Sequence, residues 1–330
     1  LDAASLERLR SALAEFITLD GLSISAQATA WFGAAPASPE DAEQAVALVD
    51  RLRRDLLPRA RDSGARAAVE VGMPTPSTMA DLAELSRLLS GVHEVESVFS
   101  REVWAEPVER MAAATADRKQ RRGMADGPGL RERRTLRNRA GELARPAARE
   151  DVTRQSSALA MASDVATSWG QRAHDGRLPR TGETSAAAVA AFTAVAEAVQ
   201  ALQQVHPQAV PDDLDLAGVA ARLGVLGDEV VWARRLPRLT ATATELADAG
   251  MGPVVAELRA RREGGQAITP ETAVAVLDSC VAASLAAQIE EHDPVLSATR
   301  GEDVRAAGKR WRQADAAAVV AASDEVRAAW

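Results

Sequence analysis

The sequence contains no tyrosine, and aromatic residues make up only 3% of the chain. Its core must therefore be built from leucine, valine and alanine, because few large rings are available to fill it. Alanine is the strongest helix former, and its small side chain lets neighbouring helices approach closely. Strand-like alternation of apolar and polar residues is absent. These features predict an all-α protein.

Cysteine is nearly absent as well, since Cys280 is the only one among 330 residues. A single thiol excludes a disulfide framework and a cysteine-based metal site. The histidines also lack the i, i+4 spacing that brings two ligands to one side of a helix. There are four of them, His93, His174, His206 and His292. We therefore expect no metal site and no cofactor in this chain.

No motif of a catalytic site is recognisable in the sequence. A phosphate-binding loop is excluded before Lys309, because the preceding glycines have the wrong spacing and Arg310 stands where that loop needs serine or threonine. The acidic run at residues 212–215 has the wrong spacing for the metal-binding boxes of helical prenyl-chain enzymes, and a helix cap explains it better. An all-helical enzyme is the least favoured class, and we expect no catalytic residue.

Long hydrophobic runs are missing near the start of the chain. The longest uncharged stretch there, residues 21–39, is rich in serine, glycine and proline and cannot span a membrane. Charged residues among the first eight exclude a signal peptide. We expect a soluble, cytoplasmic protein with no membrane partner. Helical patterns already run at Leu1 and still run at Trp330, which predicts that the chain is part of a longer protein.

Capping signals and hydrophobic spacing divide the chain into helices. Ser38-Pro39-Glu40 and Thr269-Pro270-Glu271 each combine an N-cap, a proline at the first helical position and an acidic residue. Pro58 is expected to kink or end a helix, and Gly91 to close one. Loops are expected at residues 72–78 and 206–211. The expected helices cover residues 6–17, 39–56, 81–89, 101–111, 130–145, 147–169, 185–202, 214–235, 239–247 and 270–291, with a last one from 302 onward.

Positive charge is concentrated in one stretch of an otherwise acidic chain. Residues 118–149 hold eleven positive and three acidic residues, a net charge of +8, whereas the whole chain carries −8. Three glycines and a proline within residues 123–129 cannot continue a helix, so we expect an antiparallel helical hairpin with its tip there. Charge segregated in this way indicates a polyanionic partner.

Two interpretations of this basic hairpin stay open. Its cations can neutralise phosphates of DNA or RNA, or they can form a solvated coiled-coil arm that meets an acidic protein partner or a second copy of the chain. No aromatic residue occurs between Trp104 and Trp169, so we expect contact with the nucleic-acid backbone rather than base stacking. The candidate nucleic-acid-binding residues are Arg118, Lys119, Arg121, Arg122, Arg131, Arg133, Arg134, Arg137 and Arg139.

These patterns predict an elongated antiparallel helical bundle, or stalk, that carries the basic hairpin. We expect three segments along the chain. Residues 1–100 form a helical base, residues 101–150 the basic hairpin, and residues 151–330 an alanine-rich helical bundle.

Two short stretches resemble a known family. Residues 98–104, Val-Phe-Ser-Arg-Glu-Val-Trp, resemble the start of a helical arm in large superfamily 1 helicases of the Upf1-like type. Residues 311–315, Trp-Arg-Gln-Ala-Asp, are similar to a Phe-Arg-x-Leu-Asp-like helix at the end of that insertion, with Trp in place of Phe and Ala in place of Leu.

The resemblance implies an accessory helical insertion that lies beside two-lobed, ATP-driven motor domains of the same protein and guides a nucleic-acid strand. None of the family's ATP-site residues falls within these stretches, so ATP binding and hydrolysis would belong to the parent protein and not to this chain. The alternative is a non-enzymatic helical scaffold that uses its basic arm for protein interaction or self-association.

Overall fold

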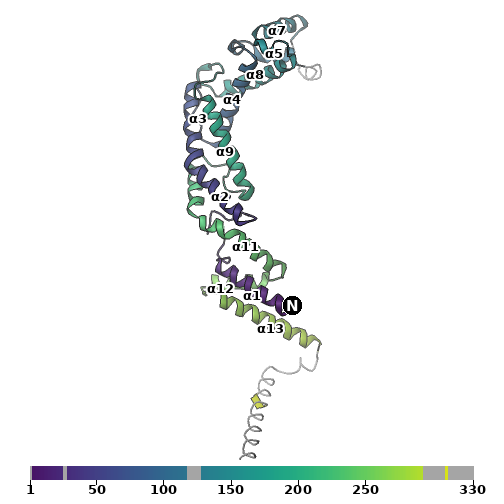
Figure 1. Ribbon diagram of the computed structural model, residues 1–330. Coiled ribbons are helices and arrows are strands. Elements are labelled where there is room, and N and C mark those ends of the chain that lie inside the picture. The colour runs from purple at the N-terminus through teal and green to yellow at the C-terminus, as the bar shows by residue number, and fades with distance from the viewer. Residues whose placement is uncertain (1, 25–27, 117–127, 293–308, 311–330) are drawn as a thin grey trace, which may run out of the picture. The chain divides into compact units, whose positions relative to one another are not determined.

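The protein is all-α, as predicted. The computed structural model describes residues 2–24, 28–116, 128–292 and 309–310 (Figure 1). Within these ranges, pairing of the β type is confined to two isolated bridges, Thr78 with Asp215 and Phe99 with Ala144. The chain groups into two compact units, residues 1–23 with 241–330 (unit 1) and residues 24–240 (unit 2). The expected three segments and the expected elongated bundle stay predictions.

The helices have the following bounds. Unit 1 contains α1 (Ala3–Thr18), α12 (Gly252–Glu263) and α13 (Pro270–His292), and α11 (Val230–Asp248) continues from unit 2 into unit 1. Unit 2 contains α2 (Pro39–Arg51), the π-helical η1 (Leu52–Leu56), α3 (Leu57–Val71), α4 (Met79–Val98), η2 (Arg101–Ala105), α5 (Val108–Thr115), α7 (Leu130–Leu143), η3 (Pro146–Ala148), α8 (Val152–Arg172), η4 (His174–Gly176), α9 (Ser185–Val205) and α10 (Leu216–Asp228).

In unit 1, the first helix of the chain packs against one of the last. Leu9, Leu13 and Phe16 recur at spacings of three and four residues and are buried, which gives α1 one apolar face. α1 lies beside α13 (Figure 1). Arg10 in α1 and Asp278 in α13 form an ion pair at 2.8 Å across this contact.

Unit 2 contains two apolar core clusters. Phe99, Met111 and Trp169 are fully buried in the first, which is built chiefly from α4, α5, α7 and α8. The second lies around Trp31 and Leu202 and is built chiefly from α2, η1, α9 and α10. Three of the few large rings, Trp31, Phe99 and Trp169, are therefore fully buried within these clusters.

Pro58 does not end a helix, which was one of the two outcomes expected from the sequence, the other being a kink. α2, η1 and α3 form one continuous helical run over residues 39–71, and Pro58 lies at the start of α3. The backbone N–H of Leu57 donates to the carbonyl oxygen of Leu52, a bond of the π type that widens this turn. The wider turn accommodates a proline, which has no N–H to donate.

Gly91 does not close a helix either, because α4 continues to Val98. A Cβ atom placed on Gly91 would lie 2.6 Å from a methyl carbon of Val165 in α8. Gly91 is therefore required for the close approach of α4 and α8, and it is not a helix end.

Two other helix boundaries differ from prediction. The expected helix over residues 101–111 is broken at Glu106 and Pro107, so that a 3₁₀ turn precedes α5. The break expected near residue 237 lies instead at Glu229, and Pro237 is inside α11. Leu236 and Leu239 on either side of Pro237 are buried, so packing retains the helix despite the proline.

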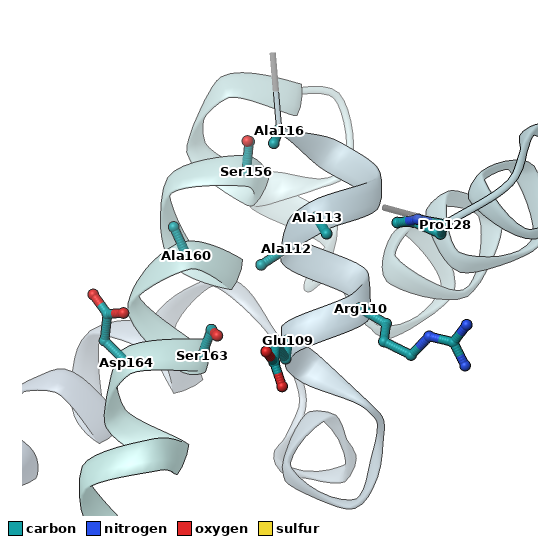
Figure 2. A pocket seen from close by; sticks show the side chains of 10 residues that line it. All are labelled: Glu109, Arg110, Ala112, Ala113, Ala116, Pro128, Ser156, Ala160, Ser163 and Asp164. Atoms are coloured by element: carbon teal, nitrogen blue, oxygen red, sulfur yellow. The ribbon is translucent and has the colours of Figure 1, made fainter. Parts of the chain in front are cut away.

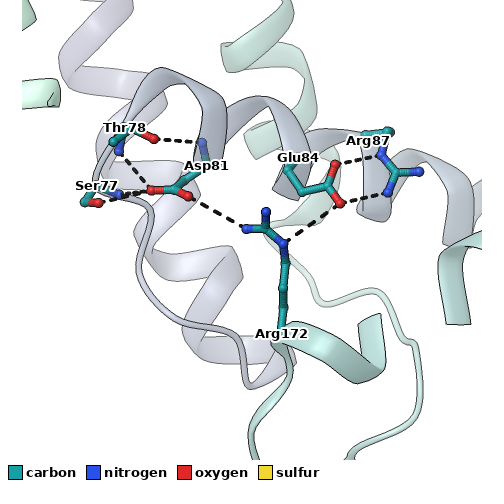
Figure 3. A network of polar contacts seen from close by, with 6 residues as sticks. All are labelled: Ser77, Thr78, Asp81, Glu84, Arg87 and Arg172. Carbon is teal, nitrogen blue, oxygen red and sulfur yellow. Dashed lines mark hydrogen bonds and ion pairs between the residues drawn. The ribbon is translucent and has the colours of Figure 1, made fainter. Parts of the chain in front are cut away.

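A polar network joins the start of α4 to the end of α8 (Figure 3). Thr78 and Asp81 form a reciprocal capping box at the start of α4. Arg172 at the end of α8 approaches Asp81 at 3.7 Å and Glu84 at 4.0 Å. The guanidinium of Arg87, 2.7 Å from Glu84, lowers the pKa of that carboxyl.

Candidate nucleic-acid interface

The structure describes five of the nine candidate cations, and all five lie on α7. Its packing explains why this stretch is helical. Leu136, Ala140 and Leu143 recur at helical spacing and face the first core cluster, and α7 packs against α5. The remaining candidates, Arg118, Lys119, Arg121 and Arg122, lie outside the described residues, as does most of the predicted hairpin tip.

The side of α7 opposite its buried residues carries two arginines whose guanidinium groups have no partner in the described part of the chain. Arg131, Arg134 and Asn138 follow one another at spacings of three and four residues, and all three are exposed. At about 100° per residue this spacing places them on one side of the helix, away from the apolar face. We call these three residues the outer face of α7. Among the described residues, the guanidinium groups of Arg131 and Arg134 have no hydrogen-bond or ion-pair partner.

Two of the other predicted cations hold α7 in place. Arg139 pairs with Glu106 at 2.8 Å and with Glu142 at 3.1 Å, and the hydrogen bond that Arg139 donates to the Glu106 carboxylate raises the pKa of Arg139. The Nε–H group of Arg137 donates to the carbonyl oxygen of Ala114 in α5 at 2.9 Å. The structure therefore separates these residues from the outer face. Sequence reasoning treated all nine cations alike.

Arg133 belongs to neither group. It is half-buried, and its Nε–H group is buried without an acceptor in the described part of the chain.

Farther along, Arg145 donates to the carbonyl oxygens of Glu96 at 2.6 Å and Phe99 at 3.2 Å, so it anchors the chain after α7 to the end of α4. Of the five described candidate cations, the two exposed ones whose guanidinium groups have no described partner, Arg131 and Arg134, thus lie in the first half of α7.

A groove of about 630 Å³ lies beside α5 and α8 (Figure 2). Ala112, Ala113 and Ala160 line it with small apolar side chains, and the carboxylates of Glu109 and Asp164 stand at its edge. Arg110 also lines the groove, but its guanidinium pairs with Glu132 at 2.6 Å. The two carboxylates therefore leave the groove less favourable to phosphate than the outer face of α7. The outer face of α7 is the better candidate interface.

Within the described residues, no group of three or more histidine, cysteine, aspartate or glutamate side chains lies in a position to hold a metal ion. Two helices, Ser185–Val205 and Pro270–Gln288, are long and apolar enough by composition to span a membrane. Core helices of soluble proteins meet the same criterion.

Comparisons with known protein families, with characterised proteins and with solved structures yield no match to this chain.

Proposed function

We propose that this chain is an accessory helical insertion of a larger, ATP-dependent superfamily 1 helicase-like protein, and that it binds the nucleic-acid backbone through the outer face of α7. The observation that carries the proposal is the presence of two exposed arginines, Arg131 and Arg134, on one side of a helix without partners among the described residues. A guanidinium group that has no carboxylate to pair with is available to a phosphate.

The spacing along α7 supports backbone contact. Arg131, Arg134 and Asn138 are separated by about 4.5 and 6 Å along the helix axis, at 1.5 Å per residue. Side chains at such intervals reach successive phosphates of one strand, whereas no aromatic residue lies near enough in sequence to stack on a base. We therefore expect binding that is strong at low salt and nearly independent of sequence.

The direct test is fluorescence-anisotropy binding of the full chain to labelled single- and double-stranded DNA and RNA across a salt series. The informative variant is R131E/R134E. Its matched control is R51E/R259E, which changes the net charge equally at two exposed arginines that also lack partners among the described residues. We expect the first variant to weaken binding at least tenfold and to lower the salt slope by about 2, while the control retains binding close to that of the wild type.

Equal losses in both variants would indicate general charge attraction and would contradict a specific surface on α7. No binding even at low salt would remove nucleic acid as the ligand, and the scaffold alternative would lead. Hydrolysis of ATP by this chain alone would overturn the assignment as an accessory region.

A further inference from the structure

A buried histidine in unit 2 contacts a loop that is itself partly buried, through Thr29, Ala30, Trp31 and Ala34. The loop comprises residues 29–35, follows shortly after the chain enters unit 2 at Ile24, and is called the Trp31 loop here. Trp31 is 1% exposed, and His206, directly after α9, is 0% exposed. Their rings stack, with 5.8 Å between the centroids and 27° between the planes. Neither residue belongs to the proposed nucleic-acid interface.

The carbonyl oxygen of Ala30 accepts two hydrogen bonds. His206 Nε2 lies 2.9 Å from it, and Arg222 Nη2 donates to it at 2.8 Å. Since a carbonyl only accepts, Nε2 carries the hydrogen of the ring. His206 Nδ1 is buried and has no partner among the described residues, so the imidazole is neutral and its Nδ1 atom is unprotonated.

The rest of the Trp31 loop is fixed from the end of α10. Glu229 Oε2 accepts hydrogen bonds from the hydroxyl of Thr29 at 2.8 Å and from the backbone N–H of Ala30 at 2.7 Å. Trp31 Nε1 donates to the carbonyl oxygen of Leu226 at 2.9 Å. The backbone N–H of Ala35 also donates to the carbonyl oxygen of Val205 at 2.8 Å. The loop is therefore held by directed bonds, of which two meet at the carbonyl oxygen of Ala30 and two at Glu229 Oε2.

The charges around His206 disfavour a second proton on its ring. Burial lowers the pKa of His206, and the neighbouring guanidinium of Arg222 lowers it further. The Trp31 loop and the last turn of α9 contain no titratable side chain, and the carboxylate of Asp228 in α10 pairs with Arg53 at 3.0 Å. Glu229 is the carboxylate bonded to the loop itself.

We propose that protonation of His206 releases the Trp31 loop, so that the loop is an acid-sensitive element of unit 2. A proton on Nδ1 would create a buried donor without an acceptor and a second buried cation beside Arg222. Outward movement of Trp31 lets the imidazolium reach water and relieves both penalties. The native contact is thus present above the ordinary histidine pKa of about 6.5 and weakens as the pH falls below it.

Hydrogen–deuterium exchange of the full chain tests the proposal by comparing the exchange of residues 29–35 at pH 7.5 and at pH 5.0, with the measured rates corrected for intrinsic exchange. If the closed loop binds no proton, its opening constant rises about tenfold for each pH unit below 6.5, or about 30-fold at pH 5.0. We expect that increase for residues 29–35 in the wild type and in H93Q, whose substituted histidine is exposed. H206Q keeps a neutral donor and should show no increase.

A second variant keeps the proposal testable if H206Q does not fold. R222Q removes the neighbouring cation, so the closed loop tolerates the imidazolium better and the acid-induced increase should become smaller than in the wild type. An absent response in the wild type, an undiminished response in H206Q, or equal responses in the wild type and R222Q would each contradict the proposal.

Discussion

At the scale of single residues, the role of a side chain depends more on its neighbours than on its residue type: on the space around it and on the groups that it pairs with. Gly91 and Gly170 are both helical glycines, yet only Gly91 has a neighbour within contact distance of an added Cβ atom. In the same way Arg134 and Arg139 lie five positions apart on α7, but only Arg139 is paired with carboxylates. Identical residues therefore have different expected effects when they are replaced.

Replacing Gly91 with alanine should destabilise the protein by about 1 to 3 kcal/mol, because the new methyl group would lie 2.6 Å from Val165 and force α4 and α8 apart. Urea denaturation followed by circular dichroism measures this loss. The control is G170A in α8, where nothing lies within 4 Å of the added atom and alanine favours the helix. Adding V165A to G91A should recover part of the loss, and a G91A variant as stable as the wild type would disprove the close contact.

At the scale of helices, the start of α4 depends on its cap. The hydroxyl of Thr78 accepts the backbone N–H of Asp81 at 3.0 Å, while Asp81 Oδ2 accepts the backbone N–H of Thr78 at 3.1 Å. These bonds satisfy two donors that no helical carbonyl can reach. Because α4 belongs to the first core cluster, weakening its start should lower the stability of unit 2.

We expect T78A to cost about 1 kcal/mol of unfolding free energy, since alanine removes the accepting oxygen, and T78S to remain close to the wild type. Thermal melting of the three proteins side by side gives the comparison. A T78S variant as unstable as T78A would mean that the threonine methyl group, rather than the cap, is what matters.

The existence of most described helices was predictable from the sequence, but α12 (Gly252–Glu263) was not predicted and several boundaries were wrong. The cap-proline-acid starts at Pro39 and Pro270 are confirmed, because they depend on residues adjacent in the chain. The continuations through Gly91 and Pro237 were missed, because they depend on packing against distant helices, and the sequence left open whether Pro58 ends its helix, which the π turn before it decides. Within α7, the i, i+3 pair of Arg139 with Glu142 was visible in the sequence, but the partner Glu106 becomes a neighbour only in the fold.

At the scale of the whole chain, the two units differ in how they are assembled from the sequence. Unit 2 is one continuous segment, residues 24–240, and contains both core clusters. Unit 1 combines the first 23 residues with the region after residue 240. A continuous segment with its own core meets the usual requirement for independent folding.

A fragment of residues 24–240 should therefore fold cooperatively by itself, with helical circular dichroism and a single urea transition. The control fragment, residues 24–200, lacks Leu202 and Leu223 of the second core cluster and should lose that cooperativity. If both fragments were equally unfolded, unit 2 would need unit 1 for its stability.

The ion pair between Arg10 and Asp278 has a consequence for biosynthesis. Its partners are 268 positions apart, so α1 leaves the ribosome long before α13 exists. At about 5 to 20 residues per second, the apolar face of α1 stays uncovered by its partner for roughly 15 to 50 s. During that interval a nascent chain exposes Leu9, Leu13 and Phe16 to other nascent chains and to chaperones, and translation speed should influence how much of the protein reaches its native state.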